Sequence, residues 1–222
     1  MIAIERRRLI QATAALGLAA ALPAAAAAPV RVTDADMSMG NPNARVTVIE
    51  YGSASCTHCA HFNNDIFPAF KAKYVDTGRV RYVFREFLTE PVSLAAVSFL
   101  IARCAGKDKY FSVLDAVFHA QADIYKTGDA DAPMRKIAQD AGLSEAQQTA
   151  CLNDKAAIDA LNARVKGYVD NDKITGTPTF FVDGERMEGV QTLDKLDAAI
   201  ARAEAKAGPP PHHAHRHPST AH

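Results

Sequence analysis

Two cysteines with the spacing Cys-x-x-Cys, Cys56 and Cys59, stand between an apolar run and a helical pattern. The run Val46–Tyr51 is nearly continuous in apolar and β-prone residues, which is typical of a strand covered on both faces. The spacing places the two sulfurs one helical turn apart, within bonding reach when the first lies at a helix N-terminus. The order of strand, dithiol and helix therefore predicts a redox-active pair at a strand-to-helix junction.

The first cysteine of the pair is expected to be the reactive one. Unpaired N–H groups and the positive end of the helix dipole favour a thiolate at Cys56, and His58 adds a potential positive charge beside it. A stabilised thiolate is a good leaving group. We therefore expect the disulfide between Cys56 and Cys59 to be oxidising.

A zinc site is the alternative interpretation, because Cys56, Cys59 and His61 offer three ligands close together. A structural zinc site usually needs a second pair of ligands at a distance. The remaining cysteines, Cys104 and Cys151, stand alone in helical patterns. Redox chemistry is therefore favoured, and we expect neither a metal ion nor an organic cofactor.

The N-terminal segment indicates where such a disulfide could persist. Arg6–Arg8 precedes the mostly apolar stretch Leu9–Leu22, and an alanine run, Ala24–Ala28, follows. These zones predict a secretory signal peptide over residues 1–28 and export to the periplasm. The arginines resemble a twin-arginine signal, although an ordinary Sec signal would look much the same. The apolar stretch is short and rich in alanine, so we expect no stable membrane insertion after cleavage.

The charge balance argues against two classes of partner. The chain has 25 basic and 25 acidic residues and a formal net charge of zero. Nothing in it indicates a groove for nucleic acid or a polybasic membrane patch. About 195 of the 222 residues would remain after processing, enough for one well-buried core, and we expect a monomer.

The second pair of cysteines is a candidate structural disulfide. Cys104 and Cys151 fall on or near apolar helix faces, and an exported protein meets an oxidising compartment. Two separately buried thiols are the alternative.

The rest of the chain is organised as strands around a long helical stretch. A second strand pattern covers Arg79–Phe87, and residues 91–171 show several helical periods without a convincing strand. Strand character returns at Thr179–Val182. Asp183-Gly184 predicts a hairpin turn, with Met187–Val190 as the partner strand before a final helix.

The C-terminal segment, residues 208–222, begins with Gly208 and three prolines and carries five histidines. Such a composition cannot build a core, which predicts a disordered tail. A weak metal-binding tract and an expression tag are the alternatives.

Together these features resemble the thioredoxin superfamily, specifically its DsbA-like branch. The resemblance spans about Ala44 to Ala205 and rests on Cys56-Thr57-His58-Cys59 after an apolar strand, on the helical insertion, and on Thr177-Pro178 entering a strand. It implies an α/β fold, thioredoxin-like with an inserted helical subdomain. The expected parts are an N-terminal extension at 29–43, a thioredoxin-like domain formed by 44–90 and 172–207, and an insertion at 91–171.

The resemblance implies that the Thr177–Pro178 peptide bond is cis and that Pro178 lies against Cys56. A proline has no N–H and so leaves a gap in strand pairing beside the sulfurs, while Thr177 offers backbone groups to an extended peptide. An ordinary trans proline at the start of a strand is the alternative.

Glu50 lies six residues before Cys56, where similar oxidases carry a buried acid. A carboxyl group in a covered strand should have a raised pKa and could exchange protons with Cys59. A glutamate paired at the surface or at a strand end is the alternative.

The resulting functional expectation is a periplasmic oxidase that donates the Cys56–Cys59 disulfide to reduced, newly exported polypeptides. The resemblance implies reoxidation by a quinone-linked membrane partner of the DsbB type. A disulfide isomerase or reductase would use the same site, and a periplasmic metal-binding protein or metallochaperone is an alternative from another class.

Overall fold

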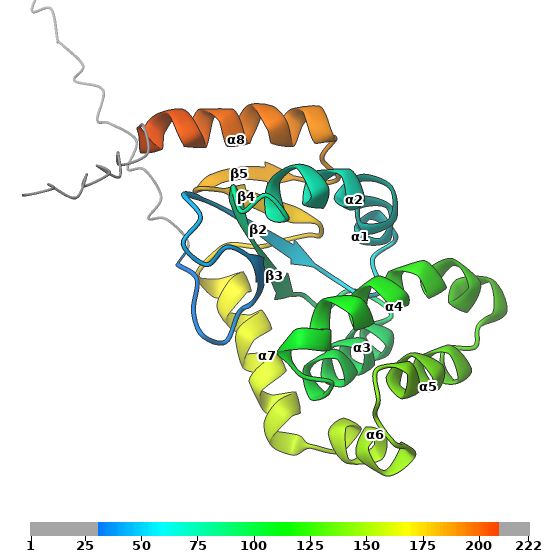
Figure 1. Ribbon diagram of the computed structural model, residues 1–222. Coiled ribbons are helices and arrows are strands. Elements are labelled where there is room, and N and C mark those ends of the chain that lie inside the picture. The colour runs from blue at the N-terminus through cyan, green and yellow to red at the C-terminus, as the bar shows by residue number, and fades with distance from the viewer. Residues whose placement is uncertain (1–30, 209–222) are drawn as a thin grey trace, which may run out of the picture.

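A mixed five-stranded sheet, in the order β1-β3-β2-β4-β5, forms the centre of the computed structural model, which describes residues 31–208 (Figure 1). Its strands are β1 (Met37–Gly40), β2 (Val46–Gly52), β3 (Val80–Glu86), β4 (Thr179–Val182) and β5 (Glu185–Glu188). Strands β2 and β3 are parallel, and the other neighbours are antiparallel. The predicted signal peptide and all but the first residue of the predicted tail lie outside the described residues.

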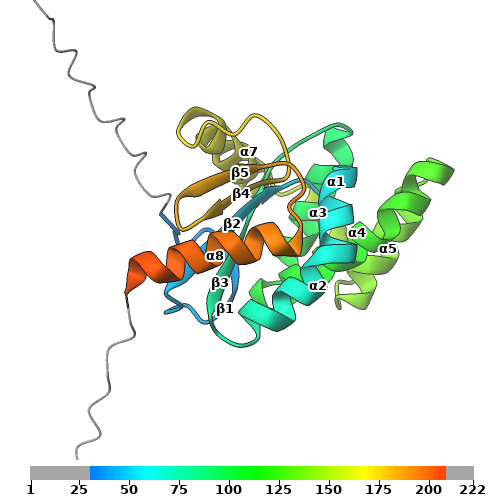
Figure 2. The same cartoon turned by 90° about the horizontal axis from the view of Figure 1, so that it is seen from above.

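The central strand β2 is covered on both faces, as its apolar sequence predicts. Val48 and its neighbours on β3 belong to the main apolar core, whereas Ile49 and Tyr51 pack with Val83 and Phe181 in a second cluster on the opposite face. The helix α8 (Leu193–Ala207) lies along one side of the sheet, beside the helices that follow the dithiol (Figure 2). The dithiol therefore follows directly after a buried central strand.

The helix after the dithiol alternates between α-helical and π-helical turns. Its segments are α1 (Thr57–His61), η1 (Phe62–Ile66), α2 (Phe67–Phe70) and η2 (Lys71–Val75). Pro68 lies in the first turn of α2, directly after the π-helical segment η1. The aromatic side chains of Phe62, Phe70 and Tyr74 on this helix are buried and pack it onto the sheet.

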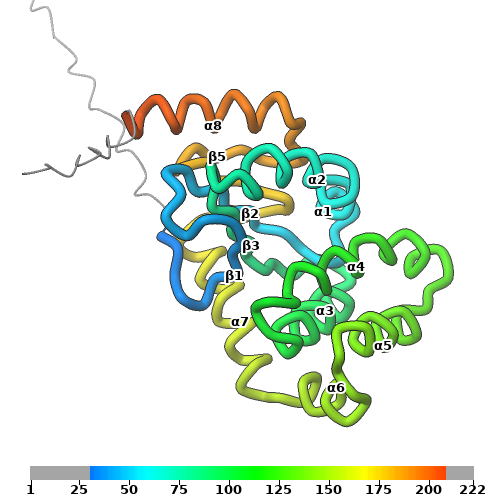
Figure 3. Tube along the Cα trace, viewed as in Figure 1, coloured from blue at the N-terminus to red at the C-terminus, as the bar shows by residue number. Residues whose placement is uncertain are grey.

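The predicted helical insertion is present and contains no strand between residues 91 and 171. Its helices are α3 (Val92–Cys104), α4 (Lys107–Thr127), α5 (Asp131–Asp140), α6 (Glu145–Leu152) and α7 (Lys155–Asp170). The chain leaves the sheet after β3 and returns to β4 along α7, as the tube in Figure 3 shows.

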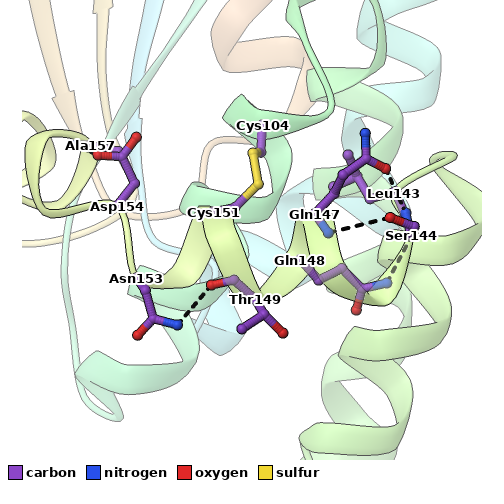
Figure 4. Close-up of a disulfide and its surroundings, with 10 residues drawn as sticks. All are labelled: Cys104, Leu143, Ser144, Gln147, Gln148, Thr149, Cys151, Asn153, Asp154 and Ala157. Carbon is purple, nitrogen blue, oxygen red and sulfur yellow. Dashed lines mark hydrogen bonds between the residues drawn. A yellow bond between two sulfur atoms is a disulfide. The ribbon is translucent and has the colours of Figure 1, made fainter.

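Cys104 on α3 and Cys151 on α6 are joined in a disulfide, with their Cα atoms 6.2 Å apart (Figure 4). At the start of α6, Ser144 and Gln147 form the reciprocal capping box that their spacing predicts. The bridge holds the short helix α6 against the longer α3, and the cap closes the N-terminus of α6.

A buried carboxylate at the end of β3 ties the insertion to the sheet. Glu86 is 1% exposed and accepts hydrogen bonds from Arg103 on α3 (2.5 Å), Arg164 on α7 (2.7 Å) and Tyr110 on α4 (3.1 Å). Three helices of the insertion therefore converge on one strand residue.

Two expectations about strands need correction. The extension 29–43 contributes β1, which pairs with β3 and was not predicted, because four residues without a β-branched side chain leave no strand pattern. The hairpin partner is Glu185–Glu188 rather than Met187–Val190, because pairing starts directly after the two-residue turn Asp183-Gly184.

The edge strand β5 is short and mostly charged. Arg186 pairs with Glu188 along the strand, and Glu185 pairs with Arg202 of α8. No helix between residues 31 and 208 is long and apolar enough to cross a membrane.

Candidate active site

The two sulfurs of the dithiol lie in different environments. Cys56 is the N-cap residue of α1 and is partly exposed, whereas Cys59, one turn later, is 0% exposed. Both are free thiols in the structure. The buried sulfur accepts a hydrogen bond from the backbone N–H of Ser53 at 3.5 Å. An incoming reagent can therefore reach Cys56 but not Cys59.

The surroundings of Cys56 favour its ionised form and lower its pKa to about 5. The largest cause is a hydrogen bond from the Cys59 thiol, which outweighs the effect of partial burial, and Thr177 and the backbone N–H groups of Cys59 and His58 add to it. His58 contributes here through its backbone N–H, and its exposed ring as a source of positive charge stays a prediction.

Below the dithiol lies a buried acid. Glu50, in the middle of β2, is 2% exposed, so the alternative of a surface pairing is wrong. Burial raises its pKa to about 8, against the hydrogen bond that Tyr82 donates to it. Burial also raises the pKa of Cys59 well above its ordinary value, and its hydrogen bond to Cys56 raises it further. Glu50 is thus a protonated acid at neutral pH beside a thiol that resists ionisation.

Gly52 provides the close packing above this acid. A Cβ atom at this position would lie 2.6 Å from the Phe84 ring and 3.0 Å from the carboxyl group of Glu50. Only glycine fits without displacing one of them.

The loop before β4 closes the site from the other side. The Thr177–Pro178 peptide bond is cis, and the Cys56 thiol lies 3.5 Å from the Thr177 carbonyl oxygen, to which it donates. The buried Thr177 hydroxyl has no other hydrogen-bond partner among the described residues, and its proximity helps to lower the pKa of Cys56. A second cis bond, Glu90–Pro91, was not predicted.

An open groove of about 430 Å³ runs past the reactive sulfur. Its walls come from the dithiol loop, the loop after β3, helix α4 and the loop before β4. The residues are Ser55, Cys56, Thr57, Thr89, Glu90, Pro91, Tyr125 and Thr177.

Hydroxyl groups that the sequence did not single out join two walls of this groove. Ser53, Ser55 and Thr89 share hydrogen bonds of 2.9–3.1 Å, and Ser55 also donates to the Thr89 carbonyl. From α4, Gln121 and Tyr125 reach the same loop. Gln121 and Tyr125 lie far from the dithiol in sequence, and no spacing rule connects them to it.

The structure does not assemble the ligands of the zinc alternative. The imidazole of His61 pairs with Asp65 at 2.7 Å. Between residues 31 and 208, no group of three or more histidine, cysteine or acidic side chains could hold a metal ion.

The predicted site residues thus fall into two places. Cys56, Cys59, Glu50, Thr177 and the adjacent Pro178 meet at the dithiol. The Cys104–Cys151 disulfide lies on α3 and α6, neither of which lines the groove.

The chain is similar to known disulfide-handling proteins. Residues 32–202 match the model of the thioredoxin family. A Rickettsia conorii protein that is provisionally named a protein-disulfide oxidoreductase is 34% identical over 174 residues, which cover 78% of this chain and 62% of that protein. The chain spans 62–66% of the length of three such Rickettsia relatives.

Solved structures show the same arrangement. Alpha-DsbA1 from Wolbachia pipientis has a TM-score of 0.71 and 28% identity, over 79% of this chain and 94% of that one. BdbD from Bacillus subtilis has a TM-score of 0.67 over 76% and 92%, and at 20% identity the likeness is one of fold. The predicted α/β fold with a helical insertion is thereby confirmed.

Proposed function

Because this chain belongs to the thioredoxin family and has the fold of DsbA structures, we propose that it is a periplasmic thiol:disulfide oxidoreductase that introduces disulfides into exported proteins. The observation that supports this proposal most directly is the asymmetry of the dithiol. Cys56 is accessible and stable as a thiolate, whereas Cys59 is buried and stable as a thiol. This asymmetry suits a disulfide that is readily given up.

The reaction starts from the oxidised protein. A substrate thiolate attacks the Sγ atom of Cys56, the Cys56–Cys59 bond breaks, and its electron pair goes to the sulfur of Cys59. Glu50, protonated at neutral pH and buried nearby, supplies the proton that makes Cys59 a neutral thiol. The product is a mixed disulfide between substrate and Cys56.

A second substrate thiolate then attacks the substrate sulfur of the mixed disulfide. The substrate disulfide forms and Cys56 leaves as a thiolate, which its hydrogen bonds and the adjacent backbone N–H groups stabilise. The substrate is oxidised by two electrons and the dithiol is reduced by two.

The groove beside Cys56 would hold the substrate as an extended chain. Thr177, whose carbonyl lies at the reactive sulfur, offers backbone hydrogen bonds to a peptide, and Pro178 has no N–H to compete. The protein would then select substrates by an exposed, unfolded segment with a free cysteine rather than by a particular amino-acid sequence.

The cellular setting is also part of the proposal. The predicted signal peptide supports export by the Sec or the twin-arginine route, and similarity to DsbA proteins and to the disulfide bond formation protein D of Bacillus subtilis supports reoxidation by a DsbB-type membrane enzyme. An isomerase or reductase would use the same dithiol from its reduced state. The stabilised Cys56 thiolate favours the oxidase direction.

The test is a comparison of two substrates of the same protein, one reduced and unfolded, the other with scrambled disulfides. We expect the purified protein to oxidise the reduced substrate much faster than glutathione disulfide does and to rescue the scrambled one poorly. Cys56→Ala should abolish the activity, and Cys59→Ala should accumulate mixed disulfides through Cys56. Efficient rescue of the scrambled substrate without fast oxidation of the reduced one would show that the protein is an isomerase rather than an oxidase.

A further inference from the structure

Two side chains of the helical insertion hold the backbone of the loop that leads into the dithiol. The amide Nε2 of Gln121 donates to the carbonyl oxygens of Ala54, at 2.8 Å, and of Cys56, at 3.3 Å. The Tyr125 hydroxyl donates to the carbonyl oxygen of Ser55, which lies between them. Gln121 and Tyr125 are one helical turn apart on α4, so both reach the loop from the same side of the helix.

These contacts supply the loop carbonyls with donors that they otherwise lack. Within residues 31–208, the carbonyl oxygens of Ala54 and Ser55 accept no backbone hydrogen bond, and both residues are buried. The Cys56 carbonyl accepts the N–H of Ala60 as well as the Gln121 amide. A buried carbonyl without a donor is unfavourable, so the positions of Gln121 and Tyr125 determine where this loop lies.

We propose that Gln121 and Tyr125 are positioning residues for the dithiol, through which the helical insertion controls the reactivity of Cys56 in the thioredoxin-like domain. The inference rests on the proposed function in that Cys56 is the reacting sulfur. Helix α4, which is remote in sequence from the dithiol, would thereby influence the reactivity of Cys56.

The physical basis is the charge of the carbonyl oxygens. Three consecutive carbonyl groups, the last of them that of Cys56 itself, carry partial negative charge in the loop that holds a sulfur which must become negative. Donors from Gln121 and Tyr125 offset that charge and keep the carbonyls turned toward α4. Because a Cys56 thiolate exists only in the reduced protein, the benefit falls on the reduced form and makes the disulfide more oxidising. The Tyr125 ring also lines the groove beside Cys56.

The test uses two variants that remove donors and little else. Gln121→Met keeps the length of the side chain without its amide, and Tyr125→Phe removes one oxygen at a partly exposed position. The matched control is Gln148→Met. Gln148 is also buried and donates Nε2 to a loop carbonyl, that of Leu143 at 2.9 Å, but it lies on α6 outside the site.

Three readouts are compared in the full-length protein: the pKa of Cys56 by thiolate absorbance, the equilibrium with glutathione, and stability to urea. We expect Gln121→Met and Tyr125→Phe to raise the measured pKa of Cys56 and to shift the equilibrium toward the oxidised protein by about threefold to tenfold, where tenfold corresponds to one pKa unit. Gln148→Met should lose stability and leave both thiol measurements unchanged.

The proposal is overturned if Gln121→Met and Tyr125→Phe behave like the control, with unchanged pKa and equilibrium. Should Gln121→Met fail to fold, Tyr125→Phe alone decides the outcome. Neither measurement requires a protein substrate. A wild-type protein without oxidase activity would therefore defeat the proposed function and still leave the role of Gln121 and Tyr125 decided by the titration.

Discussion

The pH dependence of stability should reveal the stabilised thiolate of Cys56. Its pKa falls from an ordinary 9.0 to about 5 in the folded, reduced protein. A group whose folded pKa is lowered contributes stability that is complete above its unfolded pKa and disappears as the pH falls through its folded pKa. The contribution of Cys56 should therefore grow as the pH rises from 5 toward 9.

Between pH 5 and pH 8 the linkage relation gives three pH units at about 1.4 kcal/mol each, or about 4 kcal/mol. Cys56 is partly open to solvent, and halving the value for solvent screening leaves about 2 kcal/mol. Glu50 titrates in the same range with the opposite sign, because its folded pKa is raised. The comparison is therefore made in proteins that both carry Glu50→Gln.

The measurement is urea unfolding of the reduced Glu50→Gln protein and of Glu50→Gln with Cys56→Ser, at four pH values from 5 to 8. We expect the difference in free energy of unfolding between them to increase by about 2 kcal/mol over this range. A difference that stays constant within about 0.5 kcal/mol would show that the thiolate of Cys56 is not stabilised, and the derivation from helix N–H groups and the Cys59 thiol would fail.

Three further predictions concern the rest of the molecule. Replacing Cys104 and Cys151 by alanine opens a bridge across 47 residues and should lower the free energy of unfolding in urea by about 4 kcal/mol, while oxidation of substrate continues; an unchanged midpoint would contradict this. In the oxidised protein, the buried Glu50 should lower stability as the pH rises from 4.5 to 8, by at most about 1.4 kcal/mol per pH unit, and Glu50→Gln should flatten that slope in the same urea series. Glu86→Gln leaves the guanidinium of Arg103 without its carboxylate and should cost about 3 kcal/mol, which a drop in thermal midpoint would report.

The sequence predicted those parts of the site whose signal is local. Cys56 and Cys59 are one helical turn apart in one segment, and Thr177-Pro178 directly precedes a buried strand. Such patterns need no knowledge of tertiary packing. The burial of Glu50 followed from the apolar run around it.

The residues that were missed reach the site through tertiary structure alone. Gln121 lies 67 residues from Ala54, and a glutamine in an amphipathic helix is normally solvated. Tyr82 lies among apolar neighbours on β3, a pattern typical of a core residue, and its hydroxyl is the partner of Glu50. In both cases the side chain type was compatible with a simpler role, and only the packing of distant elements identifies the partner.

The edges of the sheet have a consequence for the proposed function, in which the protein binds unfolded chains. Its outer strands, β1 and β5, have four residues each, and β5 presents Glu185, Arg186 and Glu188 in salt bridges. Two short edges, one of them charged, offer a poor template for an additional strand. Under the proposed function, an extended substrate polypeptide therefore meets few places where it can pair with the backbone, and the Thr177 carbonyl beside Cys56 is one of them. Such a protein would resist coaggregation with its proposed substrates because its sheet edges give them little to pair with.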